Sequence, residues 1–191
     1  MSTSTIESTP ATVSQLSHQE LQGTVVKALQ SVMPGENLLW TAEQTTPYEC
    51  DGLTAYRQRP LVVALPSSYE QIQSVLRTCH RLGVPVVARG AGTGLSGGAM
   101  PHERGVTLSL ARFNRILEID PLARTAQVQC GVRNLAISEA AAVHGLYYAP
   151  DPSSQIACTI GGNVAENSGG VHCLKYGLTV HNVLKVKGFT I

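Results

Sequence analysis

The chain has 191 residues, of which 43% are hydrophobic, 14% are charged and 5% are aromatic, and its formal net charge is +1. This length and balance are typical of one globular domain, or of one domain with a tail, and they exclude a disordered or fibrous protein. Because there is no basic run and few aromatic residues, we expect no nucleic-acid partner and no anionic membrane surface as the main partner.

The cysteines are five in number, widely spaced and never in a C-x-x-C pair, which favours reduced thiols in a cytosolic protein over a disulfide framework or a zinc site. No metal site is predicted. The first Lys or Arg is Lys27, so the N-terminus has neither the charged region of a signal peptide nor the arginines of a transit peptide. The sequence therefore predicts a cytoplasmic location, with peripheral association at the inner membrane left open.

Two helices are predicted in the first half of the chain. Residues 1–15 are expected to be a disordered tail, and residues 16–58 a helical and irregular segment. Ser17 and Glu20 have the capping-box spacing before an apolar stripe, which predicts a helix that ends at "MPG". Ser67 and Glu70 repeat this spacing after the apolar strand "LVVALP", and their helix ends at Gly83 before the strand "VPVVA". Residues 61–88 therefore read as a compact βαβ unit.

Three strands and a helix are predicted next. The segments "GVTLSL", "ILEID" and "TAQVQC" have strand character, and the last two are joined by a turn at Asp120-Pro121. A short helix is expected from Asn134 to His144, closed by Gly145. A glycine-rich segment and a final strand, "NVLKVKGFTI", complete the pattern, and we expect that the chain is cut within that strand.

The segment "RGAGTGLSGG", residues 89–98, contains the pattern G-x-G-x-x-G. A Rossmann loop is excluded, because Pro101 and the strand that begins near Gly105 leave no room for the helix that must follow. Glycine has no Cβ and tolerates positive φ, so successive N–H groups can converge on an anion, for which a diphosphate is the natural candidate. We expect the backbone of Gly94 to approach it too closely for a β-branched side chain. The alternative is a mobile surface loop without a ligand.

A second glycine-rich segment, "TIGGNVAENSGG", covers residues 159–170 and follows "APDPSS". Its small and amide residues suit close contact with a planar, hydrogen-bonding ligand. Two such segments in one domain indicate a long ligand, with phosphates at one segment and a ring system at the other. FAD fits this description better than a mononucleotide does.

The segments "VPVVARGAGTGLSGGA", "PDPSSQIACTIGGNVAENSGG" and "YGLT" resemble the three signature segments of the FAD-binding domain of the vanillyl-alcohol-oxidase (PCMH) type. The resemblance covers residues 45–191, and it is greatest with FAD-binding subunits of the glycolate oxidase kind. It implies an α+β fold of two subdomains around FAD, with residues 59–191 forming an incomplete FAD-binding domain that is truncated at its C-terminal side. The substrate or cap domain is expected to be absent.

The resemblance also implies the binding residues. The diphosphate would be held by Arg89, Gly90, Ala91, Gly92, Thr93, Gly94, Leu95, Ser96, Gly97 and Gly98. The flavin and its ribityl chain would be lined by Pro150, Asp151, Ser154, Thr159, Ile160, Gly161, Gly162, Ala165, Asn167 and Gly169, followed by Tyr176 and Gly177. We expect noncovalent FAD, because residues 89–99 contain neither His nor Cys. No catalytic residue is expected in this chain. For Asp151, a role in capping a turn is an equally good interpretation.

The implied activity is FAD-dependent oxidation of a small 2-hydroxy acid, with glycolate favoured, to the 2-oxo acid by hydride transfer to flavin N5. The implied partners are companion subunits of an oxidase complex and a quinone or other electron acceptor. Two alternatives remain open. One is a D-lactate or D-2-hydroxyglutarate dehydrogenase, and the other is a noncatalytic FAD- or nucleotide-binding module.

Overall fold

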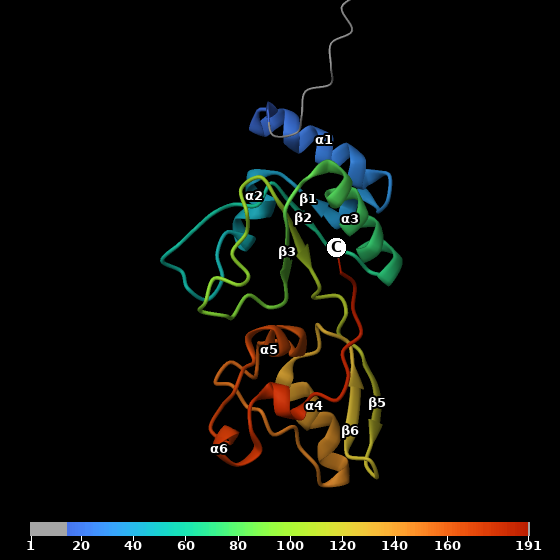
Figure 1. The fold of residues 1–191 in the computed structure, drawn as a ribbon, viewed down its shortest axis with the longest axis vertical. Coiled ribbons are helices and arrows are strands. Elements are labelled where there is room, and N and C mark those ends of the chain that lie inside the picture. Colours follow the sequence, from blue (N-terminus) through green and yellow to red (C-terminus); the bar gives the residue numbers. More distant parts are fainter. Residues whose placement is uncertain (1–14, 191) are drawn as a thin grey trace, which may run out of the picture.

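The computed structural model describes residues 15–190 and shows an α+β fold in two parts, one above the other in Figure 1. The α-helices are α1 (His18–Gln30), α2 (Ala42–Thr45), α3 (Tyr69–Leu82), α4 (Asn134–Ala141), α5 (Ile160–Glu166) and α6 (Cys173–Tyr176). The strands are β1 (Leu38–Leu39), β2 (Val62–Ala64), β3 (Val86–Arg89), β4 (Val106–Ser109), β5 (Ile116–Asp120) and β6 (Thr125–Val128). Short 3-10 turns cover Gly35–Asn37, Thr46–Tyr48, Ala142–His144 and Thr179–Asn182.

The first part contains α1, α2 and α3 and is built on a mixed sheet with the strand order β1-β2-β4-β3. β4 is parallel to both of its neighbours, so that Val106 faces Val62 on one side and Val86 on the other. The expected βαβ unit is therefore present, but its strands β2 and β3 are separated by β4. The side chains of β2 are fully buried, as expected for a strand that is covered on both faces.

The helix α1 packs against this sheet. Its residues Leu21, Val25 and Leu29 belong to the same core cluster as Leu61 and Val62, and each is 1% exposed or less. Burying such side chains contributes about 1.5–3 kcal/mol each, so the segment before residue 59 is part of the fold of the first part.

The helix starts follow the capping chemistry that the sequence indicates. The capping box of Ser17 and Glu20 is present at α1, as predicted. For α3 the predicted cap is wrong by one residue: the side chain of Ser68, not that of Ser67, accepts the N–H of Gln71. Ser67 instead donates its N–H to Oε1 of Gln71 at 2.7 Å. Gly83 ends the helix in the left-handed conformation, with φ of 63°.

The second part consists of the antiparallel hairpin β5-β6 and the helices α4, α5 and α6 (Figure 1). The hairpin turns at Asp120, whose Oδ1 accepts the N–H groups of Leu122 and Ala123, each at 2.9 Å. α4 begins at Asn134 as predicted, and its 3-10 extension closes at Gly145.

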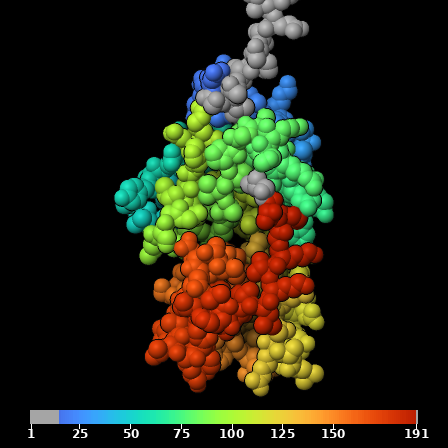
Figure 2. Space-filling view, viewed as in Figure 1, coloured from blue at the N-terminus to red at the C-terminus, as the bar shows by residue number. Residues whose placement is uncertain are grey.

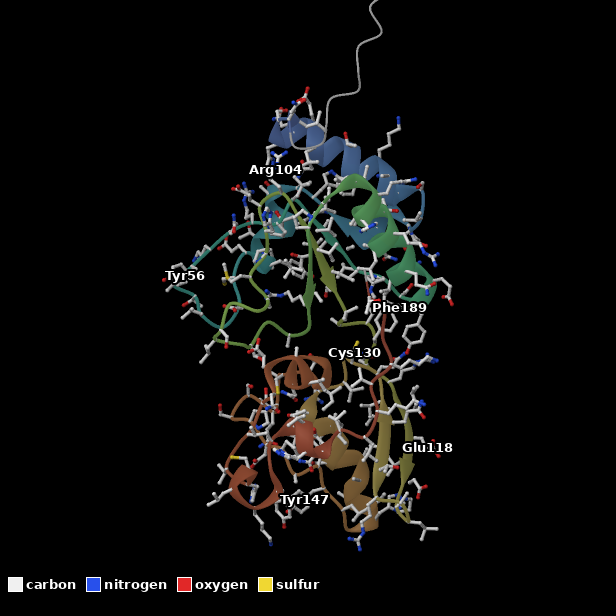
Figure 3. The ribbon with its side chains drawn as sticks, viewed as in Figure 1. Tyr56, Arg104, Glu118, Cys130, Tyr147 and Phe189 are labelled. Carbon is white, nitrogen blue, oxygen red and sulfur yellow. The ribbon has the colours of Figure 1, made fainter. Side chains whose placement is uncertain are left out.

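One expectation for the C-terminal third is wrong: the expected strand at residues 182–191 is absent from its described portion, residues 182–190. The glycine-rich segment contains the helix α5, for which the sequence made no prediction. This last segment returns to the first part, where it lies beside α3 in Figure 2. Phe189, labelled in Figure 3, has its ring centroid 6.5 Å from that of Tyr69.

All five cysteines are free, and burial raises the pKa of Cys79 to about 11. Within residues 15–190, no helix has both the length and the apolar character needed to cross a bilayer.

Candidate functional site

The glycine loop, residues 90–98, follows β3 and lies on the side of the first part that faces the second part (Figure 1). Gly92 and Gly97 have φ of 71° and 80°, in the left-handed region that favours glycine. Gly94 has no positive φ, and a Cβ there would make an ordinary contact of 3.6 Å with Oε1 of Glu166. Any steric limit at Gly94 must therefore come from a ligand and not from the protein.

Arg89 supports the loop from within. Its side chain is buried, and Nη1 donates to the carbonyl oxygens of Cys50 at 2.7 Å and Ala99 at 3.4 Å. The guanidinium also lies 5.7 Å from the ring centroid of Tyr48, and a Cβ on Gly92 would collide with it. Arg89 thus contacts protein groups on both sides of the loop, and its predicted contact with the diphosphate stays a prediction.

Asp51 and Gly52, which belong to the predicted helical and irregular segment of residues 16–58, contact the glycine loop. The carboxylate of Asp51 accepts the N–H of Gly97 at 3.0 Å, and the N–H of Gly52 donates to the carbonyl of Gly94 at 2.9 Å. These contacts join residues more than 40 positions apart, so no local pattern could have indicated them.

The second segment is anchored to the start of α4. The N–H groups of Ile160 and Gly161 donate to the carbonyls of Val132 and Cys130, both at 2.8 Å. Gly161 is required at this contact, because a Cβ there would lie 2.8 Å from Cβ of Cys130. At the far end of α5, Asn167 caps the helix with φ of 50°, which asparagine tolerates better than most residues.

Buried amides connect the same elements. Nδ2 of Asn134 donates to the carbonyl of Pro150 at 2.9 Å and to Oδ1 of Asn163 at 3.0 Å. Asn163 in turn contacts the thiol of Cys158, with Nδ2 at 3.3 Å from Sγ. Because buried amides are costly unless they are hydrogen-bonded, this network fixes the "PDPSS" segment relative to α4 and α5. Within it, the carbonyl of Ser154 accepts the N–H groups of Ala157 and Cys158.

Asp151 joins the two ends of the predicted flavin segment. Its Oδ1 accepts the backbone N–H of His172 at 3.2 Å, and its Oδ2 lies 2.7 Å from Nδ1 of the same residue. Burial acts to raise the pKa of Asp151, but the bonds from His172 outweigh it and leave this pKa below its usual value. Asp151 therefore connects segments 21 residues apart and does not cap its own turn.

Tyr176 lies in a cluster of aromatic rings next to this pair. Its ring centroid is 6.1 Å from that of Tyr147 and 6.5 Å from that of His172. The hydrogen bond from Tyr147, together with the neighbouring Lys175 ammonium, lowers the pKa of the Tyr176 hydroxyl. Gly177 has φ of 80°, and a Cβ there would lie 2.8 Å from the ring of His181.

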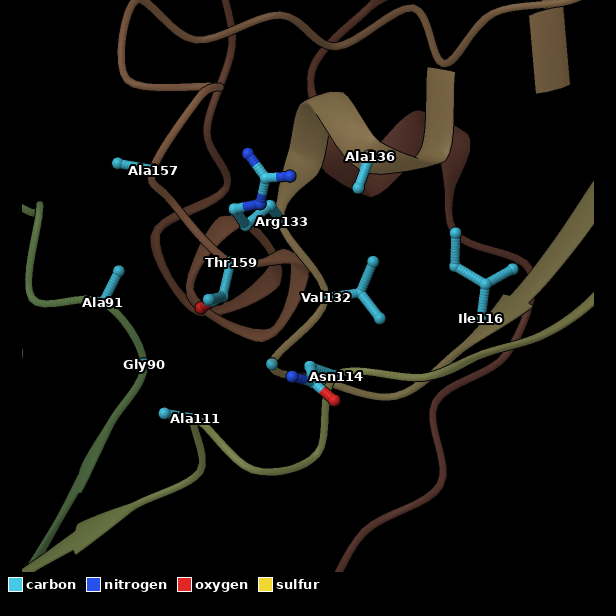
Figure 4. Close-up of a pocket in the computed structure, with 11 residues that line it drawn as sticks. Gly90, Ala91, Ala111, Asn114, Ile116, Val132, Arg133, Ala136, Ala157 and Thr159 are labelled. Carbon is cyan, nitrogen blue, oxygen red and sulfur yellow. The ribbon is translucent and has the colours of Figure 1, made fainter. Parts of the chain in front are cut away.

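A cavity of about 480 Å³ lies between the two parts (Figure 4). Gly90 and Ala91 line it from the glycine loop, and Val132, Arg133 and Thr159 line it from the second part. The hydroxyl of Thr159 is buried and has no hydrogen-bond partner within residues 15–190. Figure 4 shows this oxygen directed towards the loop, where a Cβ on Gly90 would overlap it.

The predicted residues are thus distributed over several surfaces. Gly90, Ala91 and Thr159 share the cavity, whereas Leu95, Ser96 and Gly97 line an open groove of about 710 Å³ at the tip of the loop, beside Tyr56. Tyr176 lies in the aromatic cluster, and Asp151 lies beside this cluster, where it contacts His172. A ligand that reached all of these surfaces would have to be long, and the unpartnered Thr159 hydroxyl beside the Cβ-free backbone of Gly90 fits a ligand with hydrogen-bonding groups such as FAD.

The comparison with protein families decides what kind of domain this is. Residues 60–190 match the family described as "FAD binding domain". The chain belongs to this FAD-binding family. Its FAD-binding character and α+β fold, both predicted from the sequence, are confirmed.

The chain is also similar to curated proteins. The chain is 66% identical over 167 residues to "Glycolate oxidase subunit GlcD" of Escherichia coli (strain K12), which covers 87% of this chain and 34% of that protein. It is 46% identical over 132 residues to the protein of the same name from Bacillus subtilis (strain 168), covering 69% and 28%. It is 36% identical over 165 residues to "D-2-hydroxyglutarate dehydrogenase" of Xanthomonas citri pv. viticola, covering 86% and 35%. The chain thus spans about a third of the length of these relatives.

Solved structures share the fold at low sequence identity. "Alkyldihydroxyacetonephosphate synthase" aligns with a TM-score of 0.72 and 23% identity over 82% of this chain and 31% of that one. "P-cresol methylhydroxylase with substrate bound" aligns with a TM-score of 0.70 and 22% identity over 81% and 31%. The predicted fold, an FAD-binding domain of the vanillyl-alcohol-oxidase (PCMH) type, is therefore confirmed.

Proposed function

We propose that this chain forms the FAD-binding part of an enzyme that oxidises a small 2-hydroxy acid, with glycolate favoured, to the corresponding 2-oxo acid. The unpartnered Thr159 hydroxyl, in a cavity bounded by the glycine loop, is the structural observation that carries the cofactor assignment. The identity of 66% to a glycolate oxidase subunit supports the substrate. Bound FAD supplies the redox chemistry as acceptor of the hydride.

Within this proposal, the two glycine-rich segments bind different portions of FAD. Residues 89–98 hold the diphosphate through backbone N–H groups other than that of Gly97, which donates to Asp51. The predicted residues between Pro150 and Gly177 line the flavin and its ribityl chain. FAD is held noncovalently. Residues 16–58 belong to the same folding unit as the predicted FAD-binding domain of residues 59–191. Because the chain spans about a third of its relatives' length, we place the catalytic and carboxylate-binding residues outside it.

The proposal extends to partners and location. The name of the E. coli relative describes a subunit, so we propose companion subunits and an electron acceptor such as a quinone. The free thiols favour a cytoplasmic location. A more specific form of this proposal is peripheral association of the protein with the inner membrane. Co-purification of the intact protein with its neighbours, followed by fractionation of soluble and membrane material, tests both statements.

The substrate is tested by anaerobic reduction of the bound flavin in the full-length protein. We expect glycolate to bleach the flavin absorbance faster than D-lactate or D-2-hydroxyglutarate at equal concentration. Faster bleaching by either of the latter two acids would reassign the substrate to the D-lactate or D-2-hydroxyglutarate alternative, which relatives of 33–41% identity keep open. Binding of FAD without bleaching by any 2-hydroxy acid would favour the noncatalytic module.

A further inference from the structure

Three consecutive residues before the family domain, Cys50, Asp51 and Gly52, contact the glycine loop, and we call them the clasp. The carbonyl of Cys50 accepts from Arg89 at the start of the loop, and Asp51 accepts the N–H of Gly97 near its end. The N–H of Gly52 donates to the carbonyl of Gly94 in the middle. The clasp therefore contacts the loop at two points, Gly94 and Gly97, and contacts Arg89, the residue that directly precedes the loop.

Asp51 is the most deeply buried polar group of the clasp, with 4% of the residue exposed. Both of its carboxylate oxygens accept backbone N–H groups, Oδ1 from Leu53 at 2.9 Å and Oδ2 from Gly97 at 3.0 Å. Hydrogen bonds to a charged acceptor are stronger than neutral ones, and their loss would leave buried N–H groups unsatisfied. The bond to Gly97 fixes the residue at which the loop adopts φ of 80°.

Gly52 permits this close approach. A Cβ at this position would lie 2.7 Å from the carbonyl oxygen of Thr93 and 2.8 Å from that of Gly94, and both are backbone atoms that cannot rotate away. The clasp and the loop are therefore in backbone contact, and any side chain at residue 52 must displace one of them.

A loop with so many glycines loses much conformational entropy when it is ordered around a ligand. A loop that is already ordered binds more tightly, because that entropy is lost before binding. The family match begins at residue 60, so the clasp lies outside it. We propose that the clasp, with Asp51 as its positioning residue, holds the glycine loop in the conformation that accepts the FAD diphosphate.

This proposal rests on FAD binding by the loop, but it does not depend on which acid is oxidised. The direction of the change in FAD affinity on removal of Asp51 separates this positioning role from a simple charge effect. If the charge of Asp51 acted mainly by repelling the diphosphate, its removal would strengthen FAD binding; if Asp51 positions the loop, its removal must weaken binding. The dissociation constant of FAD therefore distinguishes the two directly.

The test uses the full-length protein after removal of FAD, with titration of FAD followed by quenching of flavin fluorescence. We expect Asp51→Ala to raise the dissociation constant by about tenfold or more, and Asp51→Asn, which keeps one acceptor, by about threefold. The matched control is Glu49→Gln in the same segment, whose carboxylate pairs with the exposed Arg57 at 2.8 Å and makes no hydrogen bond or ion pair with residues 90–98. It should leave the constant unchanged.

Hydrogen exchange of the FAD-free protein supplies a second measurement. In Asp51→Ala, we expect faster exchange in peptides that cover residues 89–100 and unchanged exchange in α3. Gly52→Ala should act in the same direction, whereas Gly23→Ala, at a helix position with open space around it, should not. If the wild-type protein did not bind FAD, the proposed function itself would be wrong. The titration of the wild-type protein shows this independently of the Asp51 variants.

Three outcomes would overturn the proposal. The first is an unchanged or tighter FAD dissociation constant in a folded Asp51 variant. The second is faster exchange in α3 as well as in the loop, which would make Asp51 a general stability residue. The third is loss of folding in both Asp51→Asn and Asp51→Ala, which would also show that Asp51 is a general stability residue.

Discussion

Two buried threonine hydroxyls lack a partner within residues 15–190, and they provide a matched pair. Thr159 faces the cavity, whereas Thr107 lies in the centre of the sheet, in β4. In Thr159→Val the FAD dissociation constant should rise about fivefold, since one hydrogen bond to the ligand is worth roughly 1 kcal/mol. The melting temperature of the FAD-free protein should not fall, because no protein hydrogen bond is lost.

Thr107→Val is the control for this prediction. It removes an equally buried hydroxyl at a distance from the cavity, so it should leave FAD binding unchanged. Equal FAD affinity in Thr159→Val and the wild-type protein would show that the Thr159 hydroxyl is not a ligand contact.

Asp151 predicts a dependence of stability on pH. Its pKa in the folded protein lies below the ordinary value of 3.8, so the bonds from His172 stabilise the fold above pH 3.8. This stabilisation is lost as the pH falls through the lowered folded-state pKa. The difference in urea midpoint between the wild-type protein and Asp151→Asn should therefore be larger at pH 6 than at pH 3. The control, Glu139→Gln, affects an exposed carboxylate 3.9 Å from Arg133 and should show a smaller change. A pH-independent difference for Asp151→Asn would contradict the assignment.

The attachment of the flavin is a further prediction at this scale. Residues 89–99 contain no histidine or cysteine that could form a bond to the ring. Acid precipitation of the holoprotein should release all of the yellow colour into the supernatant. Colour that remains in the washed pellet would show a covalent link.

At the scale of elements, α5 offers two adjacent glycines with opposite surroundings. A Cβ on Gly161 would meet Cys130 at 2.8 Å, whereas one on Gly162 would only contact the Thr159 hydroxyl at 3.6 Å. Gly161→Ala should therefore lower the stability of the FAD-free protein by about 1–3 kcal/mol through overpacking. Gly162→Ala should raise it by roughly 0.5–1 kcal/mol, as expected in a helix, but weaken FAD binding, because Gly162 is proposed to line the site. Chemical denaturation and FAD titration of both variants test this contrast, and equal stability of the two would refute it.

The elements that could be predicted from the sequence are those with local signals. The helices α1 and α3 have a cap, an apolar stripe and, for α3, a terminal glycine. The helix α5 was missed because two glycines early in a helix oppose its intrinsic propensity, and the bonds of Ile160 and Gly161 to residues 130–132 support it. A strand was predicted for residues 182–191, but no strand pairs with this segment among the described residues.

At the scale of the whole molecule, the cavity of the candidate site is lined by both parts, by Gly90 and Ala91 from the first and by Thr159 from the second. The sequence indicated both glycine-rich segments and the class of ligand, because small residues and their spacing are visible locally. It could not indicate the clasp, the Asp151–His172 pair or the direction of the Arg89 side chain, because these are contacts between residues distant in the chain. Cys130, labelled in Figure 3, lies where the two parts meet, and its carbonyl accepts the N–H of Gly161.

The central claim is that the glycine loop binds the diphosphate of FAD. It is tested most directly by titrating the FAD-free full-length protein with FAD and, separately, with riboflavin, which has the same ring system but no phosphate. We predict one FAD bound per chain, with a dissociation constant at least about tenfold lower than that of riboflavin, equivalent to roughly 1.4 kcal/mol. Equal binding of the two ligands, or no binding of FAD, would contradict the claim.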